Sequence, residues 1–179
     1  TFKVRQIDGA GNTGLAAARP YLLDLTAPTA PSITVAPPAV TNDNDPSFAF
    51  TGELGVTFEC SLSTGLDAFS ACVSPRAYPN VLDGAYTFRV HAIDAAGNVG
   101  PAQSTAVTVD TVAPAAPTFV STVPGSPANE NSPEVRGAAE AGSQVLLYNT
   151  VGCSGAAIAG PSSAATASPA VSATLPNAA

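Results

Sequence analysis

Three cysteines carry the most distinctive reactive chemistry of this 179-residue sequence: Cys60, Cys72 and Cys153. Cys60 and Cys72 lie 12 positions apart across a short polar stretch. This spacing fits a disulfide bond, and a disulfide in turn indicates an oxidising compartment, outside the cell or at its surface. Two buried free thiols in a cytosolic protein are the alternative, and the repeat pattern described below favours the disulfide.

Acid–base and nucleophilic catalysis have few candidate residues. The single histidine, His91, lies between Val90 and Ala92, where alternation predicts an exposed side chain on the outward face of a strand. No Gly-x-Ser-x-Gly, His-Glu-x-x-His or phosphate-loop spacing occurs. Serine and threonine are abundant, but nothing marks one of them as activated. The sequence therefore indicates that the protein is not an enzyme.

Clustered oxygen ligands, which hard cations such as calcium require, occur in the stretch Asn-Asp-Asn-Asp directly before Pro46. Asp43 and Asp45 are the weak candidates there, and Asp94 and Asp110 are two more that could approach a domain junction. The spacing does not match an EF-hand loop, and Asx residues before proline also form turns by themselves. We therefore expect no cofactor, no metal site and no metal dependence, with calcium as the alternative.

Composition limits the partners and the fold. The 6 basic residues against 13 acidic ones give a net charge of −7, and no Lys/Arg cluster would attract nucleic acid or an anionic membrane. No apolar run of about 18 residues is present, so we expect no membrane insertion in this segment. The 17 prolines and 15 glycines break the chain into short pieces, and no stretch keeps helical periodicity.

A gapless internal repeat organises the sequence. The segment TFKVRQIDGAGN at the start of the chain matches residues 87–98, TFRVHAIDAAGN, at an offset of 86. The same offset relates Asp24 to Asp110 and Pro28 to Pro114. A period of 86 residues has the size of one small sandwich domain.

Short proline-containing linkers, residues 24–31 and 110–117, separate the repeats. Proline fixes φ and cannot donate to a β-ladder, so strands stop there. Two prolines three positions apart favour an extended, semi-rigid connector that holds neighbouring domains apart and roughly in line. The predicted organisation is a partial repeat over residues 1–27, a complete repeat over 28–113 and the first part of a further repeat over 114–179.

Five short segments of the complete repeat have the pattern of β-strands: residues 32–35, 46–50, 56–62, 85–92 and 105–109. In the clearest of them, the side chains predicted to face inward are Tyr86, Phe88, Val90 and Ala92. Those predicted to face outward are Thr87, Arg89 and His91. Several short strands with dense turn signals and no helix indicate an all-β fold, an antiparallel β-sandwich.

The last two strands of the complete repeat are joined by Asp94-Ala-Ala-Gly97-Asn98. Gly97 can take a positive φ and Asn98 tolerates it. The Asp94 carboxylate can accept hydrogen bonds from the backbone of the turn. The equivalent residues of the first copy are Asp8, Gly11 and Asn12. We therefore interpret this motif as a structural turn.

The third repeat resembles the second but lacks its cysteine hairpin. Residues 131–137 are similar to residues 43–48 of the complete repeat, and residues 143–148 follow after an Ala-Gly turn. From position 156 onward Ala, Ser, Pro and Gly dominate, which is typical of a disordered linker. We expect weak strands instead, because Val171 and Leu175 lie in a possible period-2 segment.

These motifs resemble a known family. The stretch DGAYTFRVHAIDAAGNVGPAQSTAVTVDTVAPAAP is similar to the closing strands of bacterial immunoglobulin-like (Ig-like) repeats of very long surface and secreted proteins. FECSLSTGLDAFSACVSP resembles their short disulfide hairpin, which implies a bond between Cys60 and Cys72. NENSPEVRGAAEAGSQVLLYNTVGCSG resembles a second subtype, in which the cysteine matching Cys153 pairs with one further along. That partner is not in this sequence.

The resemblance covers nearly the whole sequence and implies tandem Ig-like antiparallel β-sandwiches whose partners are neighbouring Ig-like repeats. Such repeats commonly serve as stalks of adhesins or as spacers in secreted hydrolases, and we expect a non-catalytic spacer. The alternatives are an accessory carbohydrate-binding module of a secreted enzyme and a subunit of an extracellular filament. The sequence has no Trp and only 4 Tyr, so few aromatic side chains are available to stack on sugars. This composition favours the spacer.

The two ends carry complementary parts of a repeat. Residues 1–27 supply closing strands, and residues from about 118 onward supply opening strands. We expect the chain to be an excerpt of a longer polypeptide. The alternative is a head-to-tail contact that completes a domain by strand addition and makes a homopolymer.

Overall fold

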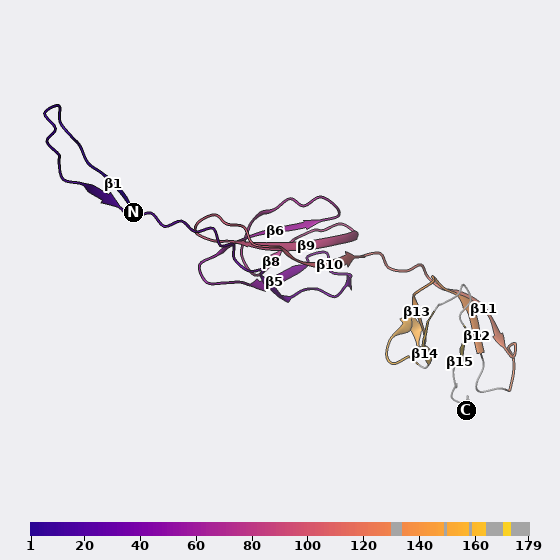
Figure 1. Cartoon of the computed structure of the whole chain (residues 1–179). Coiled ribbons are helices and arrows are strands. Elements are labelled where there is room, and N and C mark those ends of the chain that lie inside the picture. Colours follow the sequence, from indigo (N-terminus) through magenta and orange to yellow (C-terminus); the bar gives the residue numbers. More distant parts are fainter. Residues whose placement is uncertain (130–133, 149, 158, 164–169, 173–179) are drawn as a thin grey trace. The chain divides into compact units, whose positions relative to one another are not determined.

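The computed structural model describes residues 1–129, 134–148, 150–157, 159–163 and 170–172. The chain divides into two compact units, Thr1–Thr111 and Val112–Ala179, so the boundary falls inside the second proline-containing linker (Figure 1). The described residues contain β-strands and one short 3₁₀ turn but no α-helix, which confirms the all-β expectation. Within them, no helix has the length and apolar character needed to span a membrane.

The first residues of the chain form a β-hairpin. Strand β1 (Phe2–Val4) pairs antiparallel with β2 (Ala17–Arg19), with Val4 opposite Ala17. An isolated bridge between Ile7 and Thr13 extends the pairing toward the turn. The equivalent segments of the complete repeat are also paired with each other, as the 86-residue offset requires.

Two sheets make up the complete repeat. One has five strands in the order β4-β10-β9-β6-β7, and the other has three in the order β3-β5-β8. The pairings are antiparallel except for β4 with β10. The strands are β3 (Ser32–Val35), β4 (Val40–Thr41), β5 (Ser47–Thr51), β6 (Thr57–Ser63), β7 (Ser70–Cys72), β8 (Arg76–Ala77), β9 (Gly84–Ile93) and β10 (Gln103–Val109). In Figure 1, β5 and β8 lie on one side of the repeat and β6 and β9 on the other.

A small aromatic core joins the two sheets. Phe48 and Phe50 of β5 pack with Phe88 of β9, and all three are almost completely buried. The rings of Phe48 and Phe88 stack with their centroids 4.1 Å apart. Tyr78 meets each of these two rings edge-on, at 6.2 Å. A few large residues at selected positions thus produce a sandwich-like arrangement in a chain with few aromatics.

Strand β9 follows the predicted alternation. Phe88, Val90 and Ala92 are buried, and Tyr86 packs against the core from a partly buried position. Because the outward side chains of β9 alternate with these, the face away from the core carries polar residues that a neighbouring loop can contact.

Three strands of the complete repeat were not visible in the sequence pattern: β4, β7 and β8. Each has only two or three residues, too few to show a period of two. Tertiary hydrogen bonds hold them in place. At β4, for example, the Thr108 amide donates to the Ala39 carbonyl at 2.8 Å, and the Asp110 amide donates to the Thr41 carbonyl at 2.9 Å.

The second unit contains two further sheets. Strands β11 (Thr118–Val123), β12 (Glu134–Ala138) and β15 (Ala170–Ser172) form one of them. Strands β13 (Gln144–Leu147) and β14 (Ala159–Ser163) form the other, and a 3₁₀ turn covers Val151–Cys153.

Strands were predicted at two places that the second unit shows in part. Strand β12 overlaps the predicted segment 131–137 and extends one residue beyond it, and β13 falls within the predicted segment 143–148. Residues 131–133 lie outside the described residues. Of the late period-2 segment, Val171 belongs to β15, and Leu175 lies outside the described residues.

Candidate functional site

The disulfide predicted between Cys60 and Cys72 is present, with the two Cα atoms 5.8 Å apart. Cys60 of β6 is opposite Ser70, and Cys72 of β7 is opposite Phe58, so the bond runs diagonally across the β6–β7 pair. Cys60 is buried within the aromatic core. The bond therefore anchors the short edge strand β7, and the loop before it, to the centre of the repeat.

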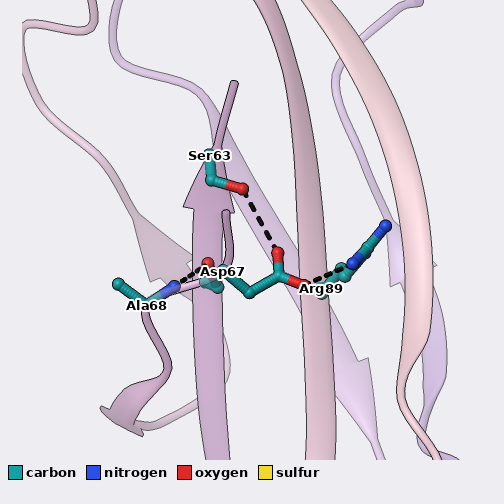
Figure 2. A network of polar contacts seen from close by, with 5 residues as sticks. Ser63, Asp67, Ala68 and Arg89 are labelled. Atoms are coloured by element: carbon teal, nitrogen blue, oxygen red, sulfur yellow. Dashed lines mark hydrogen bonds and ion pairs between the residues drawn. The ribbon is translucent and has the colours of Figure 1, made fainter. Parts of the chain in front are cut away.

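That loop, residues 64–69, contacts the outward face of the five-stranded sheet. Figure 2 shows the Asp67 carboxylate between Ser63 of β6 and Arg89 of β9. Ser63 donates to one oxygen at 3.2 Å, and the Arg89 guanidinium pairs with the other. The amide of Ala68 donates to the buried hydroxyl of Ser61 at 3.1 Å. Polar contacts on one side and the disulfide on the other thus fix this loop.

His91 lies on the predicted outward face, but the expectation of an exposed side chain is wrong. Its side chain is only 12 % exposed. Its Nε2 lies 3.0 Å from a carboxylate oxygen of Glu59, and its ring centroid lies 4.3 Å from that of Phe69. Strand alternation gives the direction of a side chain and not what a loop later places over it. We interpret His91 as part of the packing beneath this loop.

The turn after β9 is built on the Asp94 carboxylate. Its Oδ1 accepts hydrogen bonds from the amides of Ala96 and Asn98, at 2.9 and 2.8 Å, and its Oδ2 accepts one from the Asn98 side chain at 2.9 Å. Gly97 has a φ of 91°, in the left-handed region that favours glycine. The Asn98 side-chain amide, with smaller contributions from the backbone amides, lowers the pKa of Asp94 below its ordinary value.

The same turn holds the linker that enters the complete repeat. The Asn98 side chain donates to the backbone oxygen of Asp24 at 3.1 Å and approaches that of Thr26 at 3.5 Å. Gly100 lies directly against Pro28, since a Cβ at Gly100 would be 2.4 Å from the Pro28 carbonyl oxygen. Pro28 and Pro31 are both buried. The first linker is therefore docked on the repeat that it enters.

Glu53 makes a second contact with this linker. One carboxylate oxygen accepts hydrogen bonds from the Thr29 amide at 2.8 Å and the Thr29 hydroxyl at 2.6 Å. These two bonds, the hydroxyl first, lower the pKa of Glu53 below its ordinary value. Glu53 lies in a Glu-x-Gly turn between β5 and β6, where Gly55 has a φ of 84°.

The second unit repeats this arrangement at its own linker. The Ala115 amide donates to Glu140 at 3.0 Å, and Ala115 is the position equivalent to Thr29. Glu140 also lies in a Glu-x-Gly turn, with Gly142 at a φ of 85°. Sequence reasoning missed both glutamates. The recurrence of Glu-x-Gly 24 or 25 residues after the linker threonine or alanine was the available signal.

The exit of the complete repeat is anchored as well. The Asp83 carboxylate accepts the Thr111 amide at 3.0 Å and the Thr111 hydroxyl at 2.8 Å. Three residues, 112–114, lie between this anchor and the Glu140 contact at Ala115.

Three of the weak metal candidates, Asp43, Asp45 and Asp94, accept hydrogen bonds from backbone amides. Asp43 accepts the Asp45 amide at 2.9 Å, and Asp45 accepts the Asn80 amide at 2.7 Å. Asp94 and Asp110 follow opposite ends of the β9–β10 ladder, so they are not brought together. The part of the chain that the structure describes contains no group of three or more His, Cys, Asp or Glu side chains arranged for a metal ion. Metal independence remains a prediction.

Cys153 is exposed and carries a free thiol at the end of the 3₁₀ turn. Its predicted bond to a cysteine further along stays a prediction. No protein-family model matches this chain, and no curated protein matches it. The linker contacts, the loop and the disulfide are the features of this chain that bear on its function.

Proposed function

We propose that the chain is a non-catalytic structural spacer, a stalk segment of a bacterial cell-surface or secreted adhesin-like protein built from tandem Ig-like β-sandwiches. One observation carries the proposal. At two successive linkers, a glutamate in a Glu-x-Gly turn accepts a hydrogen bond from the backbone amide that follows a linker proline. A spacer needs such contacts because they shorten the length of chain that can bend between domains.

The proline content of the linkers supports the same function. Proline restricts the backbone of both linkers, and the anchors at Thr111 and Ala115 flank a three-residue segment that itself contains Pro114. We expect a joint with so few rotatable bonds to bend less than a longer flexible linker would.

The disulfide supports an extracellular location, and the positions of the aromatic residues favour a spacer over a sugar-binding module. A disulfide bond is compatible with an oxidising, extracellular compartment. Six aromatic side chains lie in or against the core of the complete repeat: Phe48, Phe50, Phe58, Tyr78, Tyr86 and Phe88. Aromatic surface that is used for the core does not serve as a stacking platform for carbohydrate.

Backbone ¹⁵N relaxation of the full chain tests the proposal. If the linker contacts stiffen the joint, residues of β9 and of β12 tumble with one common rotational correlation time. The Glu140→Ala variant should separate the two values, whereas Glu134→Ala, which removes the partner of Arg136 in β12, should not. Independent tumbling of the two units in the unmodified chain would contradict the spacer function.

A further inference from the structure

The turns at Asp8 and Asp94 have the same geometry. In the first copy Asp8 accepts the Ala10 and Asn12 amides at 2.9 and 2.8 Å, the same distances as at Asp94. The Asn12 side chain donates to the other Asp8 oxygen at 2.8 Å, as Asn98 does to Asp94 at 2.9 Å. The same turn, with the same set of hydrogen bonds, is thus present twice in the protein.

At the second copy this surface holds a linker. A primary amide has two N–H donors, and Asn98 directs one to Asp94 and the other to the backbone oxygen of Asp24. Gly100 supplies the second element, because only a residue without a Cβ leaves room for the Pro28 carbonyl. Asn98 and Gly100 therefore act together as a docking site for an extended segment.

The first copy has both elements, Asn12 and Gly14, 86 positions earlier. Among the described residues, the Asn12 side-chain amide donates only to Asp8. A Cβ at Gly14 would make one ordinary contact, 3.6 Å from the Gln6 carbonyl oxygen, and Gly14 does not have a positive φ. Nothing within the hairpin therefore requires glycine there. An open hollow beside these residues is lined by Gln6, Ile7, Asp8, Asn12, Thr13 and Gly14.

We propose that Asn12 and Gly14 form a docking site for an extended linker of the Asp-x-Thr-Ala-Pro type. This linker is the one that leads into the repeat to which the hairpin belongs. Asn12 donates its second N–H to a backbone carbonyl of that linker, and Gly14 accommodates the carbonyl of its proline. The inference rests on the proposed spacer function and adds the position of another joint.

The apolar face of the hairpin independently supports this occupant. Four of its side chains are 62–69 % exposed: Phe2, Val4, Tyr21 and Leu23. Their counterparts 86 positions later are buried core residues: Phe88, Val90, Val107 and Val109. The exposed face therefore has the composition of a core face. A repeat whose linker docks at Asn12 supplies the opening strands that cover it.

The test duplicates residues 24–86 in front of Thr1 of the full chain. Because Thr1 is equivalent to Thr87, the duplication restores one complete additional repeat together with its linker. Unfolding is followed by NMR at the Val4 and Ala17 amides. In the duplicated chain, Gly14→Ala should lower the midpoint of thermal unfolding of the added repeat by about 4–8 °C or more. In the 179-residue chain, the same change should leave the hairpin amides unaffected.

Gly100→Ala is the matched control, and it should lower the unfolding midpoint of the complete repeat in both chains. If Gly100→Ala lowers the unfolding midpoint and Gly14→Ala changes it in neither chain, the docking inference fails while the spacer function stands. If neither change acts, linker docking fails at both joints. A duplicated chain that gains no further cooperatively folded repeat would overturn the inference as well. Asn12→Ala is a second test variant. It should lower the unfolding midpoint of the hairpin amides more in the duplicated chain than in the shorter one.

Discussion

The carboxylate of Glu53 accepts two hydrogen bonds from Thr29, one from its amide and one from its hydroxyl. The two residues are 24 positions apart, one in a turn of the complete repeat and the other in the linker that enters it. In the second unit, Glu140 accepts the equivalent backbone hydrogen bond from the amide of Ala115. The backbone bond is thus common to both joints, and the hydroxyl bond is an addition at the first.

Removing the Glu53 carboxylate should loosen the first linker. In the Glu53→Ala variant, the Thr29 amide loses its acceptor, and we expect its hydrogen exchange to accelerate several-fold. Amides in the centre of β9 should keep their protection, because the core does not involve Glu53. Hydrogen exchange followed by NMR measures both. Leu54→Ala, which changes a fully exposed residue of the same turn, is the control. Unchanged exchange at Thr29 in Glu53→Ala would contradict a role for this contact.

The disulfide should contribute substantially to the stability of the complete repeat. Replacing both Cys60 and Cys72 with alanine should lower its free energy of unfolding by roughly 3 kcal/mol, the chain-entropy value for a loop of about 15 residues. Urea denaturation measures the difference. Cys153→Ser should have no comparable effect, because its thiol is exposed, lies in the other unit and pairs with neither Cys60 nor Cys72. A loss well under 1 kcal/mol in the double variant would show that the loop over the sheet is held by its polar contacts alone.

Two equivalent phenylalanines should respond very differently to the same change. Phe88→Ala removes the ring that stacks on Phe48 and should cost about 3–5 kcal/mol of stability. Phe2→Ala, at the equivalent position of the hairpin, should stay within about 0.5 kcal/mol in the 179-residue chain because Phe2 is exposed. Urea denaturation of the complete repeat gives both values. Equal losses would mean that the hairpin contributes to the fold of the complete repeat.

Acid should destabilise the turns and the first linker. Hydrogen bonds from Asn98 lower the pKa of Asp94 below its ordinary 3.8, and those from Thr29 lower that of Glu53 below 4.5. A depressed folded-state pKa gives stability that is present above the unfolded pKa and is lost as the pH falls through the folded one. We therefore expect a constant thermal midpoint from pH 7 to about 5 and a decline below about pH 4. Asp94→Asn should reduce this decline, and a midpoint flat down to pH 2.5 would refute the assignment.

Strand alternation and the 86-residue offset made much of the complete repeat predictable. The inward positions of β9 and the cysteine pair were visible because each depends on local spacing. The linker contacts were not, because a hydrogen bond between Thr29 and Glu53 depends on where the sheets place two distant turns. His91 shows the same limit, since its burial comes from Phe69 in a loop whose path the strand pattern does not fix.

The most direct test of the spacer function is the distribution of distances across the second linker. Ser104 and Cys153 are exposed residues of different units. Spin labels at Cys153 and at an introduced Ser104→Cys therefore report on this joint by pulsed electron paramagnetic resonance. We expect a single narrow distance distribution that broadens in the Glu140→Ala variant and stays narrow in the Glu134→Ala control. A broad distribution in the unmodified chain, unchanged by Glu140→Ala, would contradict the spacer function.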